Sequence, residues 1–196
     1  MIFTAITGSI GCGKTTISNI LREQGYLVYD ADKWVKYIYY RKEFLEVIRN
    51  NFPDAFDGNF FNKRKLRTLV FDNKERLKIL ENLIHPFLTE RLRKIIRKNK
   101  NKDIVFFDVA LLFENGWDKF FDFIILADVD KETQKLRVMK RDNISAEDFQ
   151  KIDNIQMPMD EKKAKVDFVI NTGVSMNKLR LNVLNVLEVL REYAEY

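Results

Sequence analysis

The residues with the clearest chemistry lie at positions 8–15, where Gly-Ser-Ile-Gly-Cys-Gly-Lys-Thr fits the spacing G-x-x-x-x-G-K-[ST]. Glycines such as Gly11 and Gly13 allow a sharp turn in which several backbone N–H groups point toward one anion. We expect Lys14 to reach the β- and γ-phosphates of a nucleotide and the hydroxyl of Thr15 to hold Mg²⁺. The pattern therefore predicts nucleoside triphosphate binding.

The segments on either side of this loop support the same interpretation. Apolar residues 2–6 precede the loop and predict a buried strand, whereas residues 16–23 follow it with a helical pattern. Because the N-terminus of a helix carries partial positive charge, this helix strengthens the anion site. The expected nucleotide-binding residues are Gly11, Cys12, Gly13, Lys14, Thr15 and Thr16.

Charge and hydropathy set limits on the partners. The 34 Lys and Arg residues against 29 Asp and Glu give a net charge of only +5, which suits polyanionic small ligands as well as nucleic acid. A length of 196 residues suits one α/β core with an insertion or two. No apolar run approaches the roughly 20 residues that cross a bilayer, so we expect no membrane span.

Cys12 is the only cysteine, which excludes an intramolecular disulfide. Together with the absence of a signal-type segment, this predicts a cytoplasmic protein. The thiol of Cys12 is expected at a helix N-terminus, where a thiol pKa is often low. We therefore also hypothesise that Cys12 is sensitive to oxidation.

Four further short apolar segments are expected to be buried parallel strands: residues 27–29, 104–107, 123–127 and 168–170. Helical patterns occupy residues 44–51, 63–71, 74–98, 131–140, 146–155 and 178–193. Strands separated by helices predict an α/β fold with a five-stranded parallel sheet flanked by helices. More than seventy residues separate the second and third strands, which predicts an inserted helical subdomain.

Carboxylates stand where three of these strands are expected to end. Asp108 and Asp128 each end a strand, and the spacing does not decide which of them supports Mg²⁺ opposite Thr15. Asp30 and Asp32 end the second strand, at the edge where α/β sheets bind ligands. One of them is expected to accept a proton from an alcohol during phosphoryl transfer. Capping of a helix or turn is the alternative role for each acid.

Two groups of basic residues invite a functional interpretation. Arg137 and Arg141 lie four residues apart on an expected helix, so their guanidinium groups point the same way and are able to clamp phosphate oxygens. The alternative is that both arginines belong to a solvated helix face. Residues 91–102 hold seven basic residues, but an apolar stripe accompanies them and interleaved aromatic residues for base stacking are lacking. We therefore expect no nucleic-acid partner.

Taken together, these motifs resemble the dephospho-coenzyme A kinase family, and the likeness runs from residue 2 to about residue 172. Its glycine-rich loop, Asp-Ala-Asp, Leu-Val-Phe, His-Pro, D-x-x-L-L-F-E, R-x-x-x-R-D and Q-M-P segments are matched in this order. They correspond to residues 7–15, 30–32, 69–71, 85–86, 108–114, 137–142 and 156–158.

The resemblance implies a P-loop kinase that uses ATP and Mg²⁺ to phosphorylate the ribose 3′-hydroxyl of dephospho-CoA, giving CoA and ADP in the last step of coenzyme A biosynthesis. It implies a nucleotide-binding core made of residues 1–32, 104–130 and 164–196. A helical CoA-binding insertion at 33–103 and a helical lid at 131–163 complete the expected domains. The oligomeric state is not predicted.

The resemblance also implies roles by position. Asp32 is the implied general base, with Lys14, Arg137 and Arg141 as further catalytic groups and Asn171 near the adenine. For His85, packing or capping is an equal alternative to substrate contact. The implied substrate-binding residues are Asp32, His85, Leu111, Phe113 and Glu114, and the implied metal residues are Thr15 and Asp108.

Three positions depart from the family pattern. Asn62-Lys63 replaces an Asp-Arg pair, Ala110 replaces a proline, and Ile152 replaces an arginine of the lid. Among other classes, a GTPase would carry N-K-x-D, which this chain lacks, and a nucleic-acid-binding ATPase would need base-stacking aromatics. The nearer alternative is a nucleoside or nucleoside monophosphate kinase of the same fold.

Overall fold

The computed structural model describes residues 1–71 and 73–195. The chain divides into two compact units, one formed by Met1–Asp32 with Asn99–Tyr196 and the other by Lys33–Lys98. The second unit corresponds to most of the insertion expected at 33–103, whereas residues 99–103 belong to the first unit. Each unit is described by itself below.

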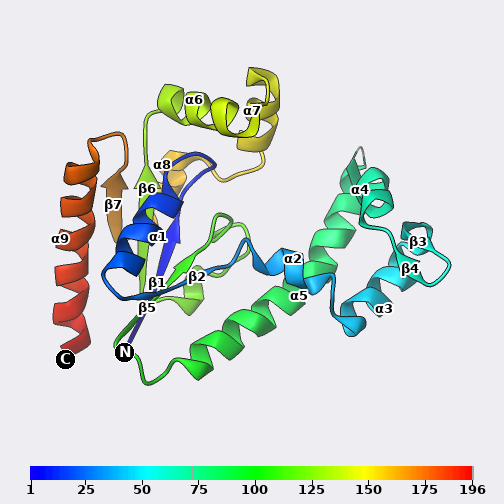
Figure 1. The fold of residues 1–196 in the computed structure, drawn as a ribbon, viewed down its shortest axis with the longest axis horizontal. Helices are drawn as coiled ribbons and strands as arrows, with labels where there is room; N and C mark the ends of the chain where they lie inside the picture. Colours follow the sequence, from blue (N-terminus) through cyan, green and yellow to red (C-terminus); the bar gives the residue numbers. More distant parts are fainter. Residues whose placement is uncertain (72, 196) are drawn as a thin grey trace. The chain divides into compact units, whose positions relative to one another are not determined.

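A five-stranded parallel sheet forms the centre of the first unit, as the sequence predicts (Figure 1). The strands lie in the order β2-β5-β1-β6-β7. All six residues of β1 are buried, because the strand is central and helices cover both faces of such a sheet. The strand bounds are Ile2–Thr7 for β1, Leu27–Asp30 for β2, Ile104–Asp108 for β5, Phe123–Asp128 for β6 and Phe168–Asn171 for β7.

Two long helices of the first unit pack side by side against the sheet (Figure 1). They are α1 (Lys14–Glu23) and α9 (Met176–Glu195), and their apolar faces share one core with the strands. The remaining helices of this unit are η2 (Asp118–Phe120), α6 (Lys131–Asp142), α7 (Ala146–Asp153) and α8 (Met159–Lys163).

Local capping explains where α6 and α7 begin. The side chain of Asp130 accepts a hydrogen bond from the backbone N–H of Thr133, and that of Ser145 accepts one from the N–H of Asp148.

The sequence analysis did not predict α8, because five residues with little apolar character give no helical period.

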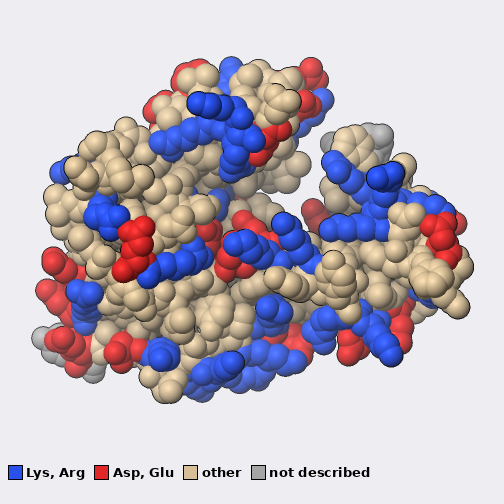
Figure 2. All heavy atoms as spheres, viewed as in Figure 1, with Lys and Arg blue, Asp and Glu red and all other residues tan. Residues whose placement is uncertain are grey.

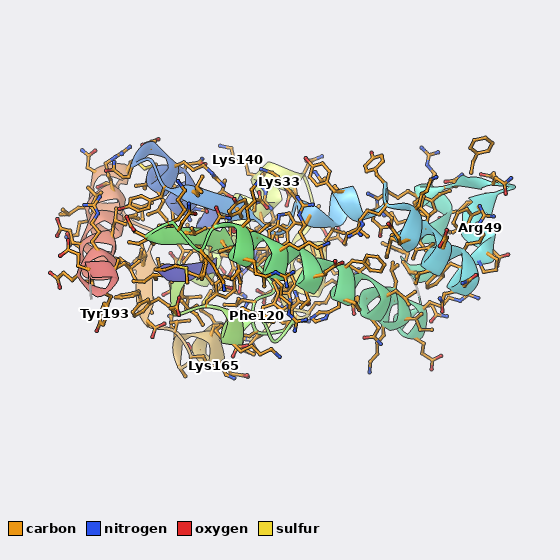
Figure 3. All side chains as sticks on the ribbon, turned by 90° about the horizontal axis from the view of Figure 1, so that it is seen from below. Lys33, Arg49, Phe120, Lys140, Lys165 and Tyr193 are labelled. Atoms are coloured by element: carbon orange, nitrogen blue, oxygen red, sulfur yellow. The ribbon has the colours of Figure 1, made fainter. Side chains whose placement is uncertain are left out.

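The second unit is mainly helical, with α2 (Trp34–Ile38), α3 (Lys42–Asn51), η1 (Pro53–Ala55), α4 (Lys63–Phe71) and α5 (Lys74–Lys98). It also contains a short hairpin of β3 (Phe56–Asp57) and β4 (Phe60–Phe61) that the sequence analysis did not predict. Arg49 of α3 holds this hairpin, since its guanidinium donates to the carbonyls of Gly58 and Asn59 and lies 4.1 Å from the Phe56 ring centre (Figure 3).

Basic side chains gather on the solvent face of α5 (Figure 2). Arg93 and Arg97 are exposed, whereas Leu88 and Leu92 of the same helix are buried in the second unit. This division is that of an ordinary amphipathic helix. Within the described residues, no helix combines the length and apolar character that a membrane span requires.

The first prediction concerns Gly8, where β1 passes into the phosphate-binding loop. Its φ is +146°, and a Cβ added there would lie 2.6 Å from the carbonyl oxygen of Ala127 in β6. Because a backbone atom cannot move aside cheaply, Gly8→Ala is expected to lower the free energy of unfolding by about 3 kcal/mol. Urea denaturation followed by circular dichroism measures it.

Gly25→Ala is the matched control for this substitution. The φ of Gly25 is also positive, at +86°, but an added Cβ there meets nothing within 4 Å. Its cost is expected to be about 1 kcal/mol, from backbone conformation alone. Equal losses for the two variants would contradict the close approach of Gly8 to β6.

Candidate active site

The loop between β1 and α1 is packed too tightly for side chains at two of its glycines. Gly11 and Gly13 have φ values of +78° and +86°. A Cβ added at Gly11 would lie 2.5 Å from Val138 of α6, and one at Gly13 would lie 2.9 Å from the hydroxyl of Thr172. The loop therefore keeps a tight turn of backbone N–H groups, the arrangement that binds phosphate.

Lys14 begins α1 and turns back over this loop. Its ammonium donates a hydrogen bond to the carbonyl of Gly8 at 2.9 Å. The same positive charge lowers the pKa of the carboxyl groups of Asp32 and Asp108, although burial has the larger and opposite effect on both. One cation and two acids from three separate segments thus lie together at the loop.

Asp108 lies at the end of β5 and is 6% exposed. Its Oδ2 accepts a hydrogen bond from the hydroxyl of Ser18 at 2.9 Å. Ser18 lies three residues after Thr15 in α1, so the two hydroxyls share a helix face. Burial raises the pKa of Asp108, while Lys14 and the Ser18 hydrogen bond oppose that rise.

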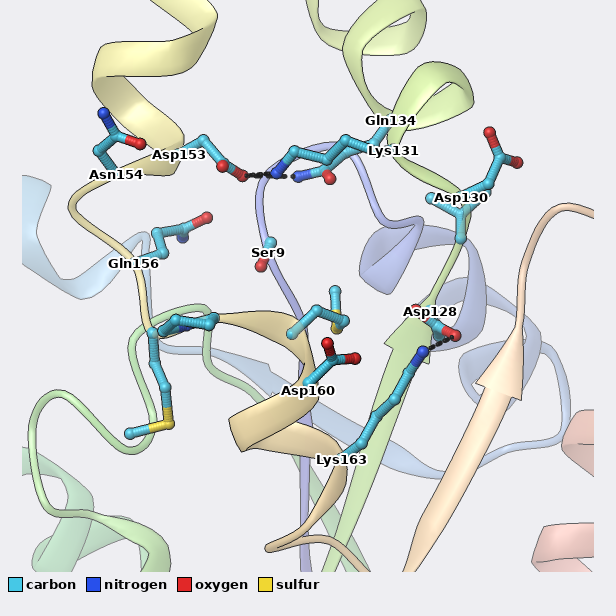
Figure 4. Close-up of a pocket in the computed structure, with 14 residues that line it drawn as sticks. Ser9, Asp128, Asp130, Lys131, Gln134, Asp153, Asn154, Gln156, Asp160 and Lys163 are labelled. Atoms are coloured by element: carbon cyan, nitrogen blue, oxygen red, sulfur yellow. Dashed lines mark hydrogen bonds and ion pairs between the residues drawn. The ribbon is translucent and has the colours of Figure 1, made fainter.

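The other strand-end acid, Asp128, has a different environment. Its carboxylate forms an ion pair with Lys163 of α8 at 2.8 Å. It lines a pocket of about 550 Å³ with Ser9, α6, α8 and residues 153–158, and a second ion pair in this pocket joins Lys131 to Asp153 (Figure 4). The sequence analysis did not predict this pocket, because its walls come from three stretches that are far apart in the chain: Ser9, residues 128–134 and residues 153–163.

Asp32 lies just beyond β2 and is exposed to solvent. Its Oδ1 accepts a weak hydrogen bond from the backbone N–H of Ala110 at 3.4 Å. Partial burial raises the pKa of Asp32, the charge of Lys14 lowers it, and Asp30 raises it further. The side chain is thus open to an incoming group while the surrounding protein removes part of its hydration.

Arg137 and Arg141 have separate partners in the structure. The guanidinium of Arg137 donates to the hydroxyl and to the carbonyl of Thr172 at 3.0 and 2.9 Å, and the Thr172 hydroxyl donates to the carbonyl of Cys12 at 2.8 Å. Arg141 is exposed and pairs with Asp142 at 2.7 Å. Thr172 thus joins Arg137 to the loop, a role that sequence reasoning missed, since one threonine after a strand carries no signal.

The hypothesis of a reactive thiol is wrong for Cys12. Its side chain is 0% exposed and packs in the core with Ile17 and Leu179. Burial raises the pKa of this thiol, and the nearby Lys14 charge opposes the rise only in part. Cys12 therefore contributes its backbone and an inert, buried side chain to the loop.

The residues implied to bind substrate have varied surroundings. Leu111 is 37% exposed, and the Phe113 ring centre lies 5.8 Å from the ammonium of Lys165. Glu114 accepts a hydrogen bond from the backbone N–H of Met157 at 2.8 Å and pairs with Lys162 at 3.2 Å. His85 is half-buried within α5 of the second unit.

Asn171 and the metal residues are the remaining site residues that the sequence analysis named. Asn171 is exposed at the end of β7, and its Oδ1 accepts from the N–H of Gly173 at 2.7 Å. Across residues 1–71 and 73–195, no group of three or more His, Cys, Asp or Glu side chains is placed to hold a metal ion. A metal here would need the Thr15 hydroxyl, a carboxylate and the phosphates of a nucleotide, which is how Mg²⁺ is usually bound.

Comparison with known proteins decides between the kinase classes. The family model described as dephospho-CoA kinase matches residues 2–177. The chain belongs to the dephospho-CoA kinase family. The dephospho-CoA kinase of Fusobacterium nucleatum is 36% identical over 193 residues, which cover 97% of this chain and 99% of that protein.

Solved structures agree with this assignment. A Thermus thermophilus protein aligns with a TM-score of 0.82 and 34% identity, covering 96% of this chain and 97% of its own. Dephospho-CoA kinase from Campylobacter jejuni aligns with a TM-score of 0.70 and 28% identity, covering 95% of each chain. The resemblance seen in the motifs is confirmed, and membership of the dephospho-CoA kinase family makes this chain a nucleotide-binding kinase that transfers phosphate to an alcohol.

The second prediction follows from the burial of Asp108. Because its pKa is raised in the folded protein above the ordinary value of 3.8, ionisation weakens the fold as pH rises through the folded pKa. Asp108→Asn removes this charge and keeps an acceptor for Ser18. It is expected to raise the free energy of unfolding at pH 8 by about 1 kcal/mol, with a smaller gain at pH 4.

Urea denaturation of the parent and the variant at both pH values tests this expectation. Asp103→Asn supplies the control, because it makes the same chemical change at an exposed position. A gain that is independent of pH, or a loss of stability at pH 8, would show that the charge of Asp108 is not disfavoured in the folded protein.

Proposed function

We propose that this chain transfers the γ-phosphoryl group of ATP to the ribose 3′-hydroxyl of dephospho-CoA, giving CoA and ADP. The observation that carries the proposal is the meeting of Lys14, Asp32 and Asp108 beside the phosphate-binding loop. Phosphoryl transfer needs a phosphate cradle, a cation and an acceptor for the hydroxyl proton in one place. Family membership supports the identity of the acceptor.

The two compact units have distinct parts in this proposal. The first unit would bind ATP, with residues 131–163 as its lid. The unit Lys33–Lys98 would bind the CoA part of the acceptor. We propose a cytoplasmic enzyme whose substrates are small molecules and whose partners do not include nucleic acid.

The nucleotide is expected to lie along the loop and the end of β7. The loop from Gly11 to Thr16 would hold the β- and γ-phosphates through backbone N–H groups and the Lys14 ammonium. Asn171 is exposed where the adenine would lie. Arg137 and Arg141 would approach the γ-phosphate from α6, after exchanging their present partners Thr172 and Asp142 for phosphate oxygens.

Thr15 and Asp108 fit a magnesium site of the kind that a nucleotide completes. Thr15 is exposed at the start of α1, and Asp108 carries an acceptor oxygen on the face shared with Ser18. Mg²⁺ bound there supplies positive charge that stabilises the developing charge on the phosphates. Burial of Asp108 strengthens its interaction with any cation, because water competes less.

Asp32 is the proposed general base. Its carboxylate would accept the proton of the 3′-hydroxyl as that oxygen bonds to the γ-phosphorus and the bond to the ADP oxygen breaks. A raised pKa makes a carboxylate a stronger base. Exposure of Asp32 leaves room for the acceptor, and the Ala110 N–H makes a weak hydrogen bond to its Oδ1.

The direct test of the proposed function follows both products of one reaction. Purified protein is incubated with ATP, Mg²⁺ and dephospho-CoA, and ADP and CoA are quantified together by chromatography with mass detection. Equal amounts of the two products are expected. ADP without CoA would contradict the proposed acceptor, and parallel reactions with nucleosides and nucleoside monophosphates would then identify the kinase class.

The third prediction tests Asp32. Asp32→Asn keeps the size of the side chain but removes the base, so kcat is expected to fall at least about a hundredfold with ATP binding nearly unchanged. Asp30→Asn, two residues earlier, is the matched control and is expected to lose much less activity. Steady-state kinetics and calorimetric ATP titration provide the measurements. A larger loss for Asp30→Asn would move the role of base to Asp30.

A further inference from the structure

Two glutamine side chains hold the same residue of the phosphate-binding loop. The backbone N–H of Ile10 donates to Oε1 of Gln156 at 2.8 Å, and the carbonyl of Ile10 accepts from Nε2 of Gln134 at 2.8 Å. Gln134 lies on α6 and Gln156 lies between α7 and α8, so the two side chains reach the loop from separate segments (Figure 4).

The chemistry of each contact is unambiguous. A backbone N–H only donates, so Gln156 must present its amide oxygen, and a carbonyl only accepts, so Gln134 must present its amide nitrogen. The same amide nitrogen also donates to Oδ1 of Asp153 at 3.4 Å. Gln134 is 2% exposed, which makes lost hydrogen bonds there costly. The two amides therefore fix both polar groups of Ile10, directly before Gly11.

Neighbouring contacts hold the glutamines in turn. Met157, next to Gln156, donates its N–H to Glu114, and Glu114 pairs with the fully buried Lys162. On the other side, a Cβ at Gly11 would lie 3.0 Å from the carbonyl oxygen of Gln134, so α6 sits directly against the loop. The Ile10 backbone is thus held by a framework that extends through Glu114, in the segment after β5, to Lys162 of α8.

We propose that Gln134 and Gln156 are positioning residues that set the conformation of the phosphate-binding loop for the nucleotide. Donors that are fixed before phosphate arrives need no reorganisation when it binds. With Ile10 released on either side, the turn at Gly11 gains alternative conformations, and ordering them weakens nucleotide binding. The inference rests on the nucleotide half of the proposed function and not on the identity of the acceptor.

The experiment uses the full chain and ADP with Mg²⁺ as the probe, measured by isothermal titration calorimetry. Gln134→Met and Gln156→Met keep the side-chain length and remove the hydrogen bond. Each is expected to raise the Kd for ADP about tenfold, and to raise the KM for ATP while that for dephospho-CoA stays within twofold. Gln150→Met is the matched control, since Gln150 is exposed on α7 and its side-chain amide donates to the side chain of Asn154, away from Ile10.

Two further variants separate positioning from charge and from folding. Gln156→Glu keeps an acceptor for the Ile10 N–H, whereas Gln134→Glu loses the donor and sets a carboxylate against the Ile10 carbonyl. Both add one negative charge near the loop, and Gln134→Glu also sets its carboxylate against Asp153, so their difference reports the loss of both donor contacts of Gln134. The Kd for ADP is expected to be at least fivefold higher for Gln134→Glu than for Gln156→Glu. Thermal denaturation shows which variants fold. If the Gln134 variants do not fold, the Kd for ADP of Gln156→Met is compared with that of Gln156→Glu, which keeps the acceptor for the Ile10 N–H.

Three results would overturn the inference. They are ADP affinities of the Met variants within twofold of the parent, equal rises in KM for both substrates, and Glu variants that bind ADP equally well. A parent that binds ADP but makes no CoA would contradict the proposed acceptor alone and leave this comparison valid.

Discussion

The close packing of one loop constrains the rest of the first unit. Residues 8–13 pass between β6, α6 and Thr172 with so little space that a methyl group at Gly8, Gly11 or Gly13 would meet atoms at 2.9 Å or less. Interiors packed to this density do not deform gradually. The loop therefore fixes where β6, α6 and the end of β7 lie, and with them the side chains at the site.

The elements that could be predicted from the sequence are those with a clear hydrophobic pattern. The five strands are continuous apolar runs, and the long helices have a clear apolar stripe, so both signals survive in a single sequence. The β3-β4 hairpin and the helices α2 and α8 were missed because two-residue strands and five-residue helices have no period to detect. Their positions depend on tertiary contacts, such as those of Arg49 with the hairpin.

The candidate site was predictable where one segment carries the chemistry. The loop with Lys14 and Thr15 is a contiguous motif, and strand-end acids such as Asp108 follow from the topology of parallel sheets. Contacts between distant segments were not predictable: Thr172 with Arg137 and Gln156 with Ile10 join residues 35 and 146 positions apart. The hypothesis of a reactive Cys12 thiol failed for a related reason. The sequence shows that Cys12 lies near the start of α1, but it does not show the core that surrounds the side chain.

The balance of charge at the loop explains why the proposed reaction would need a divalent cation. Asp30 raises the pKa of both Asp32 and Asp108, Asp32 raises that of Asp108, and the charge of Lys14 lowers the pKa of Asp32 and Asp108. An anionic nucleotide entering beside these acids meets repulsion as well as the loop N–H groups. A nucleotide that arrived with Mg²⁺ would reverse this balance, since the metal would bring positive charge to the acids. In the proposed function, the acids whose burial weakens the fold without ligand would therefore favour the metal-bound nucleotide over the free one.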